Sequence, residues 1–172
     1  MNKRRLSFVA GAVVAGTGVA ALLLGLPGVQ AEGGSPAVAV HAVDYAYQGV
    51  PGSVAAGEVR VSFTNDSKAE GHEMQLYRIN DGVNESFDQI LAEDEARQQQ
   101  NSQNPPANDN APAPKMTFFA STGAGPGDRA KMDLIGKLPA GKYGMVCFLP
   151  VNGDDANGPH YKKGMKAEFT VK

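Results

Sequence analysis

Short apolar stretches, alternating with polar residues or rich in β-branched ones, run through most of this 172-residue chain. Gly, Pro, Asn and Asp separate them, for example at Pro51-Gly52 and at Asn80-Asp81-Gly82. Such segments are typical of half-buried strands joined by tight turns. The pattern predicts strands at residues 37–47, 58–65, 72–79, 116–121, 129–134, 141–149 and 165–171. We therefore expect an all-β chain folded as one antiparallel β-sandwich or barrel.

One stretch departs from this pattern. Residues 86–100 place a few apolar side chains among many Glu, Asp and Gln: Phe87, Ile90, Leu91 and Ala92. Ser86 followed three places later by Gln89 is the start signal of a capping box, so a short amphipathic helix is predicted. Residues 101–114 are rich in Asn, Pro and Ala and offer little to bury, which predicts a mobile surface loop. Together they form an insertion at about 84–115, short, helical and partly disordered.

The first 31 residues have the features of a secretion signal. Three basic residues at positions 3–5 precede an apolar stretch, 6–26, and Val29-Gln30-Ala31 supplies the small-residue cleavage pattern. We expect a mature domain at 32–172, exported to the periplasm or the extracellular space. The apolar stretch is longer than a usual signal core, so an uncleaved membrane anchor stays an alternative. The general and the twin-arginine export routes both stay open.

Charge excludes one class of partner. Removal of the leader takes away three basic residues and changes the formal net charge from −2 to −5. The mature chain carries no run of Lys and Arg of the kind that nucleic acids require. We expect no nucleic-acid binding, and membrane contact only through an uncleaved leader.

The single cysteine, Cys147, lies near the end of an apolar run that begins at Tyr143. A lone cysteine in an exported protein has no partner for an internal disulfide, so burial or metal ligation would protect its thiol. His72 begins a predicted strand, while His160 and Met165 follow Cys147 and lead into the last one. One thiolate, two imidazoles and one thioether are the ligand set of a blue-copper site. Each side chain also has a purely structural interpretation, as core filling or as a loop residue.

These features resemble the cupredoxins, the type 1 copper proteins that include plastocyanin and azurin. The resemblance covers the mature domain apart from the insertion and is strongest at Phe63-Thr64-Asn65, Gly71-His72, Leu138-Pro139-Ala140-Gly141-Lys142-Tyr143 and residues 147–171. It implies a Greek-key β-sandwich and one copper ion, held equatorially by His72, Cys147 and His160 and axially by Met165. Two features depart from the small electron carriers of this family. Twelve residues separate Cys147 from His160, and Glu73 stands where those carriers commonly have Asn.

The resemblance implies a function in electron transport. We expect an exported cupredoxin that carries single electrons to or from a redox protein partner, with the exposed edge of His160 conducting the electron. The alternatives are a metal-free cupredoxin-like interaction module and a copper carrier of the cell envelope. We expect no enzymatic activity, because no orienting group or oxyanion loop accompanies Cys147.

Overall fold

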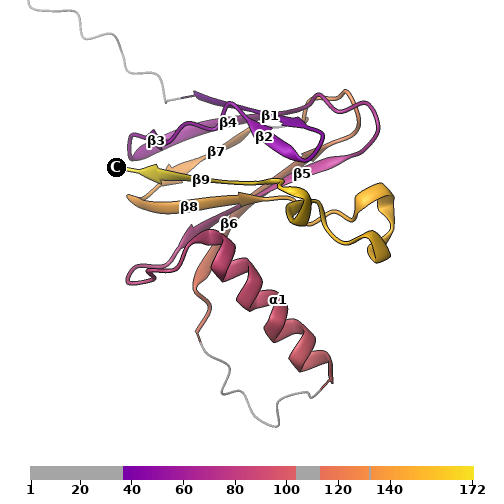
Figure 1. Cartoon of the computed structure of the whole chain (residues 1–172). Coiled ribbons are helices and arrows are strands. Elements are labelled where there is room, and N and C mark those ends of the chain that lie inside the picture. Colours follow the sequence, from indigo (N-terminus) through magenta and orange to yellow (C-terminus); the bar gives the residue numbers. More distant parts are fainter. Residues whose placement is uncertain (1–36, 104–112, 132) are drawn as a thin grey trace, which may run out of the picture. The chain divides into compact units, whose positions relative to one another are not determined.

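Two β-sheets share one apolar core in the computed structural model, which describes residues 37–103, 113–131 and 133–172 (Figure 1). The first sheet has the strand order β2 (Ala46–Gln48), β1 (Ala37–Val43), β4 (Gly57–Asn65), β7 (Leu134–Leu138). The second has the order β3 (Ser53–Val54), β9 (Lys166–Val171), β8 (Gly141–Val146), β5 (His72–Ile79), β6 (Met116–Ala124). The predicted leader, 1–31, lies outside the described residues.

Alternation of buried and exposed residues places the core between the sheets. In β1 every second side chain is buried, as an amphipathic strand requires: Val38, Val40 and Ala42. The same core cluster takes Phe63 from β4, Leu76 from β5 and Tyr143 from β8. The prediction of an all-β sandwich is therefore confirmed.

The strand directions differ in part from the antiparallel expectation. β1 pairs with β4, and β3 with β9, in parallel. Between β1 and β4 the chain leaves the first sheet and adds β3 to the second one, so β4 can return in the direction of β1. A sequence pattern with a period of two residues shows which side chains are buried but not which strand lies beside which.

Two predicted strand boundaries were wrong. The segment 37–47 is a hairpin rather than one strand, because Asp44 adopts a positive φ of 47° between β1 and β2. In the described part of the segment 129–134, Arg129 forms an isolated bridge to Thr64, and the strand β7 begins at its last residue, Leu134.

The helix α1 (Phe87–Gln103) confirms the predicted insertion helix and extends it by three residues. Its capping box is present: Ser86 N–H donates to Gln89 Oε1 (2.8 Å), and Gln89 N–H donates to Ser86 Oγ (3.3 Å). Residues 104–112 of the predicted mobile loop lie outside the described part of the chain. No helix among the described residues is both long and apolar enough to cross a lipid bilayer.

The helix packs on the outer face of the second sheet. Phe87, Ile90 and Leu91 form a second apolar cluster with two strand residues, Ile79 and Val146. A glycine makes this close approach possible, since a Cβ added at Gly144 would lie 2.4 Å from the Phe87 ring. Both faces of β8 are covered as a result, and its four last residues, 143–146, are all buried.

Between β8 and β9 the chain forms three short 3-10 helices: η1 (Val151–Gly153), η2 (Asp155–Asn157) and η3 (His160–Lys163). Pro150 and Pro159 form an isolated β-bridge, and Val151 N–H donates to the Gly158 carbonyl (3.0 Å). These contacts close the loop at its base.

Candidate metal centre

Three elements meet at one end of the sandwich, and each supplies one of the predicted ligands. His72 is the first residue of β5, Cys147 directly follows β8, and His160 begins η3. β5 and β8 are antiparallel neighbours, so the start of one lies beside the end of the other. Backbone hydrogen bonds bind the third element to them, because Tyr161 N–H donates to the Cys147 carbonyl (3.0 Å).

The three side chains converge on one buried spot. His160 Nδ1 lies 3.0 Å from His72 Nδ1 and 3.3 Å from Cys147 Sγ, and all three atoms lie within 4.8 Å of one another. Each of these residues is at most 1% exposed. A thiol and two imidazoles that share so small a buried volume are the donors that copper or zinc prefers.

The long segment between Cys147 and His160 does not keep the two residues apart. The bridge at its base brings Pro150 against Pro159, and His160 N–H donates to the Leu149 carbonyl (2.9 Å). Asn152 takes a positive φ of 54° and starts the outward turn of the extra residues. Loop closure of this kind costs little free energy, so the extra length is compatible with a shared site.

Met165, the predicted axial ligand, is buried in the same core cluster as Cys147. Its backbone contacts both of the ligand residues that precede it. Cys147 N–H donates to the Met165 carbonyl (3.2 Å), and Met165 N–H donates to the His160 carbonyl (3.2 Å). The ligand role of its thioether stays a prediction, as do the ligand roles of the other three residues.

Burial controls the protonation of the thiol. It raises the pKa of Cys147 to about 11, although the backbone N–H groups of Glu73 and Leu149 act in the opposite direction. The negative charges of Glu73 and Glu70 raise this pKa further. The thiol is therefore protonated in the metal-free protein at neutral pH, and a metal ion has to displace its proton.

The outer edge of His160 is covered, which corrects one expectation. The residue is 1% exposed, and its Nε2 lies 2.8 Å from Glu70 Oε2. The prediction of an exposed His160 edge was wrong, because a carboxylate from the loop before β5 occupies that position. His160 has no solvent-facing nitrogen through which a partner could make contact.

Glu73 connects two of the ligand segments. Its Oε1 accepts the N–H of Phe148 (3.0 Å), the residue that follows Cys147. Its backbone carbonyl accepts a hydrogen bond from Tyr47, and Gln75 Nε2 donates to the same Oε1 (3.1 Å). The carboxylate at this position therefore ties the start of β5 to the segment after β8.

Comparison with solved structures shows which fold the chain has. The chain is similar to a dithionite-reduced auracyanin from the photosynthetic bacterium Roseiflexus castenholzii, with 21% identity, a TM-score of 0.50, and coverage of 81% of this chain and 99% of that one. The chain has the cupredoxin fold. Also similar are auracyanin A, a "blue" copper protein from Chloroflexus aurantiacus (20% identity, 81% and 100% covered, TM-score 0.49), and reduced rusticyanin (22%, 81% and 81%, 0.43). No protein-family model and no curated protein matches the sequence.

The predicted resemblance to the cupredoxins is thus confirmed for the fold, and the donor atoms fit one type 1 copper ion. The soft sulfur of Cys147 and the two imidazole nitrogens form the trigonal set that such an ion requires. The other nitrogen of His72, Nε2, is buried without a hydrogen-bond partner among the described residues.

Sequence reasoning missed the residues that surround His160. Tyr45 lies edge-on to both imidazole rings and donates to Glu70 Oε1 (2.6 Å). Two acidic residues, Glu70 and Glu73, flank Gly71-His72 in the sequence, and this was the one signal that could have directed attention to Glu70.

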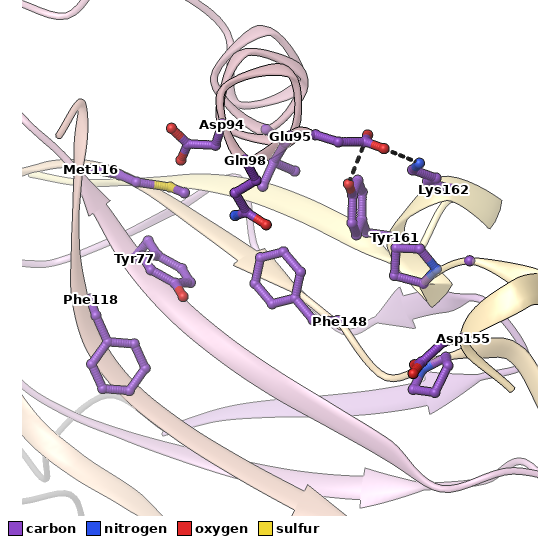
Figure 2. A pocket seen from close by; sticks show the side chains of 14 residues that line it. Tyr77, Asp94, Glu95, Gln98, Met116, Phe118, Phe148, Asp155, Tyr161 and Lys162 are labelled. Carbon is purple, nitrogen blue, oxygen red and sulfur yellow. Dashed lines mark hydrogen bonds and ion pairs between the residues drawn. The ribbon is translucent and has the colours of Figure 1, made fainter. Parts of the chain in front are cut away.

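Phe148, the residue after Cys147, lines a surface groove of about 580 Å³ (Figure 2). Four rings follow one another along it, with centroid distances of 5.4, 6.4 and 5.6 Å: Tyr161, Phe148, Tyr77 and Phe118. The middle turns of α1 form one wall, where Glu95 accepts hydrogen bonds from Tyr161 and Lys162. Phe148 links the groove covalently to Cys147.

Proposed function

We propose that this protein binds one copper ion and carries single electrons to or from a redox protein partner. One observation carries the proposal: Cys147 Sγ and the Nδ1 atoms of His72 and His160 converge in a buried space, in a chain with the cupredoxin fold. Bound copper would supply one-electron exchange between its two oxidation states. An enzymatic reaction forms no part of the proposal.

The protein would hold the ligands still. His72 and Cys147 belong to neighbouring strands of one sheet, and Glu73 connects their ends through Phe148 N–H. His160 is bound to the same structure by its backbone and by Glu70. Ligands that change little between oxidation states favour rapid electron exchange, and such rigidity comes from supporting contacts of this kind.

Copper titration tests the proposal. Addition of Cu(II) to the metal-free protein should produce an intense visible thiolate band that saturates at one copper per chain. Cys147→Ser should abolish the band, because oxygen replaces the soft sulfur. Met165→Leu should keep the colour and shift the reduction potential. Met145→Leu, which alters another buried methionine of the same core, is its matched control and should change neither.

Absence of stoichiometric binding and of a thiolate band in the wild-type protein would refute electron transport and leave the fold unaffected. It would favour the metal-free interaction module. Copper bound tightly without such a band would favour a copper carrier instead.

The route of the electron is also part of the proposal. Since His160 is covered, Phe148 offers the protein's aromatic connection from Cys147 to the surface groove. Phe148→Leu should slow electron exchange with an inorganic complex such as ferricyanide while leaving the visible band in place. An unchanged rate would exclude this route. Export to the periplasm or beyond is proposed from the leader alone.

A further inference from the structure

Every oxygen of the Glu70 carboxylate has a partner. Oε1 accepts the Tyr45 hydroxyl (2.6 Å), and Oε2 accepts the backbone N–H of Asn152 (2.8 Å) and lies 2.8 Å from His160 Nε2. The Glu70 side chain is 14% exposed, whereas that of His160 is 1% exposed. The carboxylate therefore closes the site from outside.

The rest of the protein holds Glu70 in this position. Asn65, which is fully buried at the end of β4, donates through Nδ2 to the Glu70 carbonyl (2.8 Å) and to the Ala124 carbonyl (3.1 Å). The Tyr45 hydroxyl and the Asn152 N–H both donate to this carboxylate, as they would to an ionised one. An ionised carboxylate only accepts hydrogen bonds, so His160 Nε2 has to carry a proton.

This proton determines the state of the remaining ring nitrogens. With Nε2 protonated, a neutral His160 presents the lone pair of Nδ1 towards His72 and Cys147. At 3.0 Å, His72 Nδ1 then has to donate its own proton to His160 Nδ1 in the metal-free protein. His72 Nε2 then carries no proton, and it has no hydrogen-bond partner among the described residues.

We propose that Glu70 is a positioning residue that presets His160 to bind metal through Nδ1 and places a negative charge behind it. The two histidines are then unequal. The Nδ1 lone pair of His160 already faces the site, whereas His72 can bind a metal through Nδ1 only after its proton has moved from Nδ1 to Nε2. The expected effects of Glu70 on copper affinity and on the reduction potential rest on the proposed function. The tautomers of the two histidines are properties of the metal-free protein.

The metal-free protein gives the first test. In ¹⁵N–¹H correlation spectra, His160 should be protonated at Nε2 and His72 at Nδ1. Glu70→Ala should allow His160 to populate both tautomers. Glu70→Gln should keep the wild-type tautomer, because its amide oxygen can replace Oε2 while its NH₂ group donates to the Tyr45 oxygen. Protonation of wild-type His160 at Nδ1 would overturn the assignment, even if the protein binds copper.

The copper-loaded protein gives the second test. Loss of a partner behind a histidine ligand typically weakens metal binding about 10–100-fold, so Glu70→Ala should lower copper affinity by this factor. Glu70→Gln removes the charge but keeps the contacts. It should raise the reduction potential, because a negative charge favours the more positive oxidation state of the metal.

A matched control separates local charge from net charge. Glu93→Gln removes the same charge from α1, where Glu93 pairs with Lys115, and should leave the potential unchanged. Equal potentials in Glu70→Gln, Glu93→Gln and wild type would overturn the electrostatic role. A wild-type protein that binds no copper would refute the proposed function, and the tautomer test would still decide the role of Glu70.

Discussion

The two faces of β8 support regions of different chemistry. On the inner side, Met145 and Cys147 belong to the main core, and Cys147 meets two buried histidines. On the outer side, Val146 packs under the apolar residues of α1. The inner region buries polar donors, and one of their nitrogens, His72 Nε2, has no hydrogen-bond partner among the described residues, which costs stability. The outer region buries only hydrocarbon and stabilises the fold directly.

This difference predicts that substitution of the metal-donor residues alters metal binding, and that substitution of the residues packed between α1 and β8 alters stability. The largest effect should come from His72→Ala and His160→Ala, since each removes a direct ligand. Copper affinity should fall by more than the about 10–100-fold typical of outer contacts, and the visible band should disappear. Absorption during copper titration measures both, and circular dichroism should still show folded protein. Retention of the band by either variant would remove that histidine from the site.

Truncation of Phe87, the largest side chain between α1 and β8, should have the next largest effect. Phe87→Ala removes a 1% exposed ring and should cost about 3–5 kcal/mol of unfolding free energy. Denaturant unfolding measures this, and the copper band of the folded fraction should be unchanged. Ile135→Ala, at a site that is 56% exposed, is the control and should change stability by less than about 0.5 kcal/mol. A changed copper spectrum in Phe87→Ala would show that the two regions are coupled.

A smaller effect is expected at the glycine below the same ring. Gly144→Ala should cost about 1–3 kcal/mol, because the added Cβ forces the Phe87 ring to move. Gly52→Ala is the control, since an added Cβ there meets nothing within 4 Å. The double variant Gly144→Ala/Phe87→Ala should lose less unfolding free energy than the sum of the losses in the two single variants. Additive costs would mean that the ring is not the obstacle.

The smallest effect is expected beyond the helix. Replacement of residues 104–112 by a Gly/Ser segment of equal length should change the unfolding free energy by less than about 0.5 kcal/mol, because this stretch has no large apolar side chain to bury. Thermal unfolding and copper titration should both match the wild type. A large loss of stability would show that the segment packs on the domain.

The sequence alone determined the features that depend on neighbours along the chain. Alternating apolar residues located most strands, and Ser86 with Gln89 located the start of α1, because these signals act over a few residues. The side chains that meet at the site were also predicted, since Cys147 is the single cysteine and His72 and His160 stand at strand boundaries. The donor atoms that a side chain offers to a metal depend on its residue type, which the sequence states directly.

Only the tertiary structure decided which side chains surround the donors. Glu70 and His160 are 90 positions apart in the sequence, and no local pattern states that they touch. The parallel pairing of β1 with β4 likewise follows from the path of the chain between the sheets. His160 is buried where Tyr45, between β1 and β2, and Glu70, from the loop before β5, contact its ring. Exposure, tautomer and the charge near a ligand are set by packing, and packing depends on contacts between distant parts of the chain.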